Sequence, residues 1–344
     1  MSVMRVLRTM AVLTICAGLS LPASAGVRRP DVLDSYHVGL GAAHPSVGAV
    51  LFDTPSGSYL GSGTLITNGN AGGDWVLTAA HCVDGATSVT FITDANLLDG
   101  WSPEDTHEAA RFLPHPKWNG DASRGSDIGL IQLANPIEST TIQAAGRYTQ
   151  ELEVGASGVF VGYGRTGTGD IGATEGAGTR RAGNNTIDQL FKTRGKTLGI
   201  FAYDFDSGDV ADNVFGAADQ EDYEYLTSFG DSGGPTFIDG LLAGVHSFVV
   251  DENEDGGDIN LGDYEGWCNY GDWAGDTRVS AFNRWIDKVI GDDEGGHGGG
   301  KPPWAGKPGG PKDSFVAGAP VPEPASLSLL ALGALLAVRR RRWR

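Results

Sequence analysis

Short runs of apolar and β-branched residues, separated by turns rich in Gly, Asn and Asp, recur between Val47 and Leu261 and constrain the fold more than any other feature. The runs are Val47–Phe52, Gly63–Thr67, Trp75–Ala79, Ser88–Thr93, Ile128–Leu133, Gly158–Gly162, Thr197–Tyr203 and Leu241–Val250. Many short strands at this spacing are typical of all-β sandwiches and barrels. The 53 glycines among 344 residues fit a body in which much of the chain is turn and loop.

A convincing helical pattern occurs in only one place, at the end of this region. Between Ala281 and Ile290 the apolar residues share one face of a helix. They are Phe282, Trp285, Ile286, Val289 and Ile290. Gly291 follows, and glycine commonly ends helices. We therefore expect an all-β body with one C-terminal helix.

The N-terminal residues have the layout of a secretory signal peptide. Arg5 and Arg8 precede an apolar run, and the small residues Ala23-Ser24-Ala25 close it. This order of charge, apolar run and small-residue site predicts export and removal of residues 1–25 by a signal peptidase. A buried N-terminal helix is the alternative.

The C-terminal residues form a second processing signal. Pro322-Glu323-Pro324 precedes an apolar run, 325–338, and then four arginines, 339–342. This tail, 321–344, resembles the PEP-CTERM sorting signal, which implies an exosortase-type processing enzyme as a partner. A permanent membrane anchor is the alternative. The Gly/Pro/Lys-rich stretch before it, residues 291–320, predicts a flexible linker. We thus expect an exported protein, extracellular or associated with the cell envelope, that its tail anchors transiently in the membrane.

Charge and cysteine content narrow the class further. The net charge is −18, which argues against nucleic acid as a partner. Of the three cysteines, Cys16 leaves with the signal peptide. The remaining two, Cys82 and Cys268, could pair in an exported protein, but the sequence leaves this open.

Three separated motifs carry the residue types needed for nucleophilic catalysis. His81 ends the strand-like run Trp75–Ala79, and Asp127 stands at the start of another. Ser232 lies in Gly230-Asp231-Ser232-Gly233-Gly234-Pro235, where flanking glycines allow a tight, exposed turn. A serine hydroxyl needs a base, a histidine can accept its proton, and an aspartate can orient that histidine. The backbone amides of Gly230 and Ser232 would form the oxyanion hole.

The order of these motifs along the chain distinguishes two hydrolase classes. The glycines around Ser232 also satisfy the G-x-S-x-G turn of α/β-hydrolases, in which the serine comes first and the histidine last. Here the order is His81, Asp127, Ser232. Of the histidines after the serine, His246 falls in a strand-like run and His297 in the linker. The order therefore excludes the α/β-hydrolase interpretation.

With these motifs in that order, the region from about Val47 to Ile290 resembles the trypsin/chymotrypsin family of serine proteases. Further segments agree with the resemblance: Gly61–Ile66, Gly162-Tyr163-Gly164, Gly244–Phe248 and Thr277–Ser280. The resemblance implies two six-stranded antiparallel β-barrels within residues 26–290, followed by the C-terminal helix. It also implies a serine endopeptidase that acts on protein or peptide substrates through an acyl-enzyme intermediate, without a cofactor or metal.

The chain departs from the family at several positions. Gly61 and Ser228 stand where relatives usually carry disulfide cysteines. The aspartate before the nucleophile, Asp231, would pair with a free N-terminus as in the family, and we expect that terminus between Gly26 and Val38. The specificity pocket would include Leu226, Ser247, Phe248 and Val249. Leu226 replaces the aspartate of trypsin, so we expect cleavage after small or medium apolar residues rather than Arg or Lys.

Weaker patterns receive structural interpretations. The acidic stretches 204–209 and 251–255 could bind calcium, but they match no full loop signature, and we expect acidic surface loops. We expect residues 164–183 to form a long surface loop. His107 and His115 have no metal-type spacing and are expected to be structural or surface residues. The functional alternative for the whole chain is a catalytically silent trypsin-like module that binds envelope or matrix components.

Overall fold

The computed structural model describes residues 26–66, 73–193, 196–216, 220–251 and 267–294. The expected signal peptide, the sorting tail and most of the expected linker lie outside these residues. No helix within the described ranges is long and apolar enough to cross a membrane. The rest of this section concerns the body that carries the candidate site.

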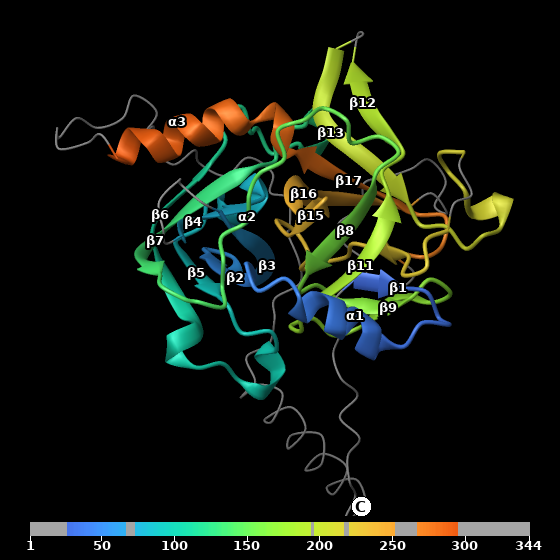
Figure 1. The fold of residues 1–344 in the computed structure, drawn as a ribbon, viewed down its shortest axis with the longest axis horizontal. Coiled ribbons are helices and arrows are strands. Elements are labelled where there is room, and N and C mark those ends of the chain that lie inside the picture. Colours follow the sequence, from blue (N-terminus) through green and yellow to red (C-terminus); the bar gives the residue numbers. More distant parts are fainter. Residues whose placement is uncertain (1–25, 67–72, 194–195, 217–219, 252–266, 295–344) are drawn as a thin grey trace, which may run out of the picture.

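The first half of the body is a closed barrel, seen on the left of Figure 1, with strand order β2-β3-β4-β7-β6-β5. Its strands are β2 (Val47–Thr54), β3 (Gly57–Ile66), β4 (Gly73–Thr78), β5 (Ser88–Ile92), β6 (Thr106–Pro114) and β7 (Gly129–Ile137). Every neighbouring pair is antiparallel. Closure leaves no unpaired strand edge, and the interior is filled by apolar side chains such as Leu65, Trp75 and Phe91.

The second half contains two sheets. A seven-stranded antiparallel sheet has the order β11-β8-β15-β16-β17-β13-β12. Its strands are β8 (Ser157–Gly162), β11 (Arg181–Thr186), β12 (Gln189–Thr193), β13 (Lys196–Asp204), β15 (Pro235–Ile238), β16 (Leu241–Val250) and β17 (Trp273–Arg278). A four-stranded sheet has the order β10-β9-β1-β14, in which only β1 and β9 run parallel. Its strands are β1 (Gly26–Arg28), β9 (Thr166–Thr168), β10 (Gly172–Glu175) and β14 (Tyr225–Leu226).

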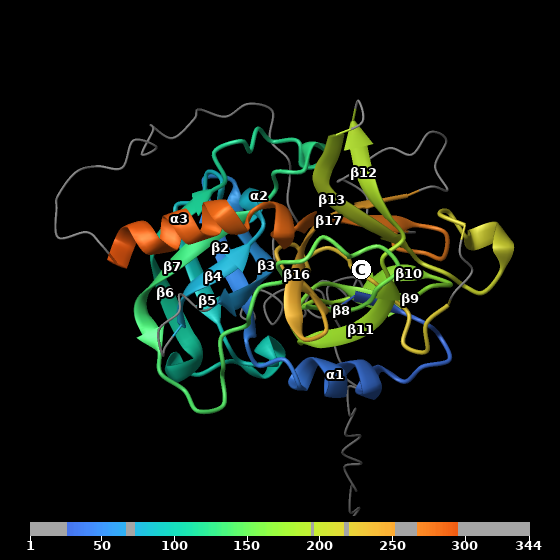
Figure 2. The ribbon, with the colours of Figure 1, turned by 45° about the horizontal axis from the view of Figure 1, so that its top comes forward.

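Helices are few and peripheral. They are α1 (Asp34–Ala42), α2 (Ala80–Val83) and α3 (Asn283–Glu294), with 3-10 turns at Leu97–Asp99, Pro103–Asp105, Ala122–Arg124, Val210–Asp212 and Val279–Ala281. Figures 1 and 2 show α3 extending across the first barrel, while α1 lies against the outer side of the second half, beside β11.

The all-β expectation is confirmed, and each expected run contains or overlaps a strand. Several local details differ. The expected surface loop 164–183 contributes β9, β10 and the beginning of β11. Helices α1 and α2 were not predicted, and α3 continues through Gly291 to Glu294. In place of a second six-stranded cylinder, the second half is a seven-stranded sheet flanked by a four-stranded one, because the N-terminal strand β1 adds to β9 and β14.

Candidate active site

His81 is placed by the first barrel. Strand β4 ends at Thr78, and the chain turns at once into the single-turn helix α2, which carries His81 in its middle. The ring Nδ1 lies 2.7 Å from Asp127 Oδ2, and the His81 backbone N–H donates to Asp127 Oδ1 at 2.9 Å. Two contacts to one carboxylate fix both the backbone and the ring of His81. The side chain is 7% exposed.

Asp127 is one of the points at which the two halves of the molecule contact each other. It is fully buried just before β7, and Ser247 Oγ, from β16, donates to its Oδ2 at 2.6 Å. Thr277 Oγ1, from β17, donates to its backbone carbonyl at 2.8 Å. Because the ionised carboxylate only accepts hydrogen bonds, the Nδ1 atom of His81 carries a proton and donates to it. The unprotonated nitrogen of the neutral ring is then Nε2.

The environment of His81 favours proton binding. Burial opposes a charged imidazolium, but the adjacent Asp127 carboxylate and the Cys82 sulfur outweigh burial and raise the pKa of His81 well above 6.5. A raised pKa makes the ring a stronger proton acceptor.

Ser232 lies in a tight turn between β14 and β15, directly beside the His81 segment. Gly230 and Gly233 on either side of it have positive φ values of 98° and 84°, which side chains rarely tolerate. A Cβ on Gly233 would lie 2.1 Å from Thr78 Oγ1. The Ser232 carbonyl accepts from the Ser62 N–H at 2.8 Å and from Cys82 Sγ at 3.6 Å. The turn is therefore packed against the first barrel, next to the residue that follows His81.

Asp231 anchors this turn from inside the second half. It is fully buried, and its two carboxylate oxygens accept from the Gly164 N–H and the Ser228 N–H, each at 2.8 Å. Burial raises the pKa of Asp231 to about 6, although His246 and the two backbone amides act in the opposite direction. The structure thus brings His81, Asp127, Asp231 and Ser232 to one junction.

The four expected pocket residues lie in three different surroundings. Leu226 and Val249 share one hydrophobic cluster with Trp267 and Cys268. The Ser247 hydroxyl instead contacts Asp127. Phe248 packs against Trp273, with ring centroids 5.9 Å apart, in a different cluster. Only the side chains of Leu226 and Val249 are therefore placed to shape a common apolar surface.

A second buried His–Asp pair lies under the serine turn and was not anticipated from the sequence. His246 Nδ1 is 2.9 Å from Asp276 Oδ2, and both side chains are at most 2% exposed. Asp276 also accepts from Thr236 Oγ1 and Tyr203 OH. The His246 backbone bonds to Gly233 and Gly234, so this network supports the turn from below. Nothing local in the sequence marks these residues, since they lie on different strands.

Two expectations about acidic segments and cysteines can now be compared with the structure. Asp204 and Asp206 are buried, not part of an acidic surface loop, because Asp204 ends β13 and receives the N–H groups of Val214 and Phe215. Of the stretch 251–255, only Asp251 is described, and it is buried as well. The described ranges contain no cluster of His, Cys, Asp or Glu suited to a metal ion.

Cys82 and Cys268 are both buried and unpaired with each other, and a Cβ on Gly61 would lie 3.0 Å from Cys82 Sγ.

The two histidines expected to be structural or surface residues differ in burial. His115 is buried, and its ring packs edge-on against Phe282 and Trp285, with centroids 4.9 and 4.8 Å away. His107 is only partly exposed and lies beside Phe91. His115 is therefore a structural residue that joins the first barrel to the C-terminal helix.

The family model described as "Trypsin" matches residues 41–274, which include the His81, Asp127 and Ser232 segments. The chain belongs to the trypsin family. Residues 320–342 match the PEP-CTERM protein-sorting motif, which indicates export and sorting to the cell envelope. A trypsin-family domain is thus joined to a sorting tail.

Curated relatives align with most of this trypsin-family protein. Mast cell protease 3 from Ovis aries is 26% identical over 72% of this chain and 85% of its own. Brachyurin from Leptuca pugilator is 26% identical over 68% and 88%, respectively. Chymotrypsin-like elastase family member 1 from Macaca fascicularis is 28% identical over 66% and 77%.

Solved structures agree on the fold. HL collagenase aligns with a TM-score of 0.53 at 21% identity, over 73% of this chain and 96% of its own. Neuropsin, a serine protease of mouse brain, aligns with a TM-score of 0.51 at 21% identity over the same shares. The trypsin-family domain therefore has the chymotrypsin-like fold.

Proposed function

We propose that this protein is a serine endopeptidase in which His81, Asp127 and Ser232 form the catalytic triad. The observation that carries the proposal is the buried His81–Asp127 pair, held by contacts of 2.7 and 2.9 Å, beside the glycine-flanked turn of Ser232. An aspartate that contacts both the ring and the backbone of a histidine fixes its orientation and tautomer. That arrangement is what a general base for a neighbouring hydroxyl needs.

In this mechanism Ser232 Oγ attacks the carbonyl carbon of the scissile peptide while His81 Nε2 accepts the serine proton. The tetrahedral intermediate collapses as His81 returns that proton to the leaving amine, and an acyl-Ser232 remains. Water then repeats both steps and releases the acid. The amides of Gly230 and Ser232 donate to the oxyanion, each contributing about 3–4 kcal/mol.

For specificity we propose cleavage after small or medium apolar residues. The support is the apolar pair Leu226 and Val249, which share one cluster with Trp267 and offer no charge to a basic side chain. Burying an unpaired Arg or Lys there would be costly. A peptide-library digest tests this, and a strong preference for Arg or Lys would contradict it.

The amino terminus proposed to pair with Asp231 is supported by the pairing of β1. Val27 lies opposite Leu226 of β14, and Gly26 lies beside Thr166 of β9. Strand β14 is followed by Ser228, and strand β9 is preceded by Gly164. The backbone N–H groups of these two residues donate to Asp231, so the chain before Gly26 points towards this carboxylate. Residues 26–28 form β1, so a terminus that began later would remove part of this sheet. Within the proposed interval, the pairing of β1 therefore favours Gly26 as the first residue.

The two ends of the chain are assigned to export and sorting. We propose that a signal peptidase removes residues 1–25 and that an exosortase-type enzyme processes the tail after transient membrane anchoring. Cell fractionation with and without residues 321–344 tests the second step. Equal distribution of both forms would contradict a sorting role.

The decisive experiment treats the exported protein with a fluorophosphonate probe, beside Ser232→Ala and the control Ser58→Ala, which removes an exposed hydroxyl of β3. We expect labelling of the wild type and of Ser58→Ala but not of Ser232→Ala. Folded wild-type protein that remains unlabelled with a verified Gly26 terminus would make the silent binding module the better interpretation.

A further inference from the structure

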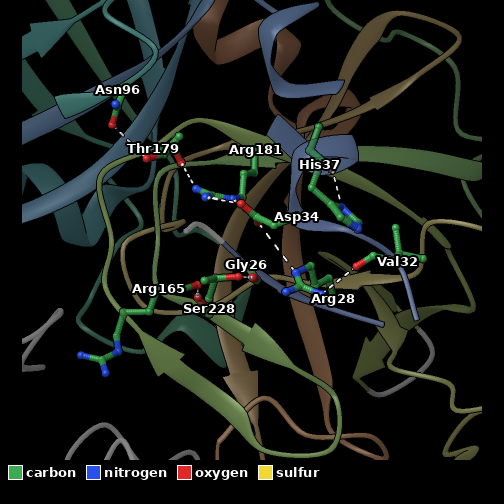
Figure 3. Close-up of polar contacts among 12 residues, drawn as sticks. Gly26, Arg28, Val32, Asp34, His37, Asn96, Arg165, Thr179, Arg181 and Ser228 are labelled. Atoms are coloured by element: carbon green, nitrogen blue, oxygen red, sulfur yellow. Dashed lines mark hydrogen bonds and ion pairs between the residues drawn. The ribbon is translucent and has the colours of Figure 1, made fainter. Parts of the chain in front are cut away.

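Gly26 lies in a narrow site beside Tyr225, called the seat below, that has room only for glycine. Its φ is +60°, and a Cβ built on it would lie 1.8 Å from Cζ and 2.0 Å from the hydroxyl oxygen of Tyr225. Thr166 Oγ1 donates to the Gly26 carbonyl. Figure 3 shows Gly26 beside Arg165 and Ser228, whose side chain donates to the Arg165 carbonyl. The space that a side chain at position 26 would need is filled by the Tyr225 ring.

The Tyr225 hydroxyl has an unmet hydrogen-bonding capacity at this seat. Tyr225 is fully buried, and its hydroxyl has no hydrogen-bond partner among the residues that the structure describes. Burial, and after it the nearby Asp231 carboxylate, raise the pKa of Tyr225 well above 10, so the phenol stays neutral and can accept a hydrogen bond. A buried polar group without a partner is costly, which marks the seat as built for a further group.

The segment that follows holds Gly26 in place. Arg181, from β11, makes a two-pronged contact with Asp34 of α1 at 2.7 and 2.8 Å. His37 Nδ1 lies 2.9 Å from the Ala182 carbonyl, and Arg28 donates to the Val32 carbonyl at 2.7 Å (Figure 3). These contacts fasten α1 and β1 to the second half, so residue 26 cannot slide along the seat.

From these contacts we infer that Tyr225 is a positioning residue that receives the free amino group of Gly26 together with Asp231, and that removal of the leader during export is itself the activating cleavage. This inference rests on the proposed function. Hydrolysis breaks the bond between the Ala25 carbonyl carbon and the Gly26 nitrogen. Water supplies a hydroxyl to the Ala25 carboxyl and a proton to the new amine, which takes up a second proton as an ammonium. No second protease is needed.

The chemistry of the seat matches an ammonium group. Three N–H donors become available, while the Tyr225 oxygen and the Asp231 carboxylate supply acceptors. A carboxylate that already accepts two backbone amides has lone pairs left for a further donor. Burial holds the pKa of Asp231 at about 6, and a neighbouring positive charge would stabilise its ionised form. A terminal ammonium therefore offsets the cost of burying this carboxylate.

The test compares two forms of the exported chain, one beginning at Gly26 and one with a single serine added before Gly26. The extension keeps the side chains of the seat but moves the amine. We expect fluorophosphonate labelling to slow roughly 100-fold in the extended form, the scale of losing one partner of a buried ion pair. Equal labelling of both forms would overturn the inference.

A second measurement does not depend on activity. Cyanate at neutral pH modifies exposed α-amines, and mass spectrometry of the N-terminal peptide reports the fraction modified. We expect the Gly26 amine to be protected in the natural form and reactive in the extended form. An amine that reacts as fast in the folded protein as in urea would overturn the inference, even if Ser232 is labelled.

Tyr225→Phe isolates the hydroxyl while keeping the ring. We expect about tenfold slower labelling, faster cyanate modification, and loss of activity at a pH about one unit lower than in the wild type, since the ammonium loses one acceptor. Tyr59→Phe is the matched control, because it removes a hydroxyl of the first barrel that bonds only to Ser56 at 3.0 Å. Identical behaviour of the two variants would refute the role of Tyr225. Failure of the proposed function would differ, because Ser232 would then be unlabelled while the amine remained protected.

Discussion

Both halves of the body are built from β-strands, but their interiors differ. The first barrel is filled by apolar side chains, among them Val50, Leu65, Leu77 and Ile131. Most buried Asp, Glu, His and Arg side chains of the described residues belong to the second half or pack against it. They are His37, Glu153, Arg180, Arg181, Asp204, Asp206, Glu224, Asp231, His246, Asp251, Asp272, Asp276 and Arg278. In the first barrel and its connections, the buried Asp, Glu, His and Arg residues are His115 and Asp127.

The two halves therefore contribute different features to the candidate site. A closed barrel with an apolar interior needs only strands whose side chains alternate between the inside and the outside. His81 and Asp127 lie at the rim of this barrel. The second half buries many polar groups, and the N-terminal segment and the His246–Asp276 network supply partners for several of them. The backbone of His246 also bonds to Gly233 and Gly234, so the network supports the serine turn.

The largest effect expected is the loss of catalysis in Asp127→Asn, where the two halves meet. The amide can donate to the His81 ring and stabilise the wrong tautomer, so we expect kcat/KM to fall by about 10⁴ with little change in fold. Hydrolysis of a peptide substrate and circular dichroism measure the two effects. Asp53→Asn, a surface change on β2, is the control and should keep full activity. Comparable activity of both variants would remove Asp127 from the triad.

Breaking a buried ion pair in the second half should be the largest stability effect. Arg278→Met leaves Glu153 buried without its partner at 2.8 Å, and we expect a loss of about 3–5 kcal/mol in the free energy of unfolding. Adding Glu153→Leu should restore most of the loss, because the uncompensated charge is then gone. Urea titration of both variants measures this. A double variant no more stable than the single one would mean that the pair itself stabilises the half.

In the apolar barrel, a cavity should have a somewhat smaller effect. Leu77 is fully buried, and we expect Leu77→Ala to lower the free energy of unfolding by about 3 kcal/mol, from lost transfer free energy and the cavity left behind. The exposed Leu152→Ala is the matched control and should change stability by less than about 0.5 kcal/mol. If Leu77→Ala were as mild as Leu152→Ala, the view of a tightly packed first barrel would be wrong.

The smallest effect expected is a pH dependence specific to the second half. Burial raises the pKa of Glu224 from 4.5 to about 9, so the folded state holds a proton that the unfolded state loses above pH 4.5. Stability contributed by this proton is present at low pH and is lost as the pH rises towards 9. We expect Glu224→Gln to flatten the decline of unfolding free energy between pH 6 and 7, by up to about 1.4 kcal/mol over that pH unit. Parallel curves for wild type and variant would contradict a buried neutral Glu224.

Local sequence was most informative in the first barrel. Val47–Phe52, Trp75–Ala79 and Ser88–Thr93 were predicted as strands and coincide closely with β2, β4 and β5. Helix α1 was missed, since its nine residues, 34–42, include two glycines and its N-terminus has no side-chain cap. It is held by Arg181, which lies 147 residues away from Asp34. A contact of that separation leaves no trace in a window of neighbouring residues.

In the candidate site, too, some residues were predictable from local sequence and others were not. The motifs around His81, Asp127 and Ser232, and their order along the chain, were sufficient to nominate a hydrolytic triad, because nucleophilic chemistry demands those residue types. The pocket was less predictable: Ser247 and Phe248 were grouped with Leu226 and Val249, yet Ser247 contacts Asp127 and Phe248 packs elsewhere. The strand pairing decides this, since the register of β16 against β17 shifts between His246 and Phe248 and so breaks the simple alternation of faces around Ser247.

By itself, the sequence determined the strand-rich architecture, the C-terminal sorting motif and the residues from which a chemistry is proposed, since periodicity, turn residues and motif order are properties of neighbouring positions. Only the tertiary structure decided that Asp204, Asp276 and Arg278 are buried, that β1 seats Gly26 against Tyr225, and that Asp127 joins the two halves. The free energy of a buried polar group depends on partners brought from distant strands, and those partners are defined only when the sheets have assembled.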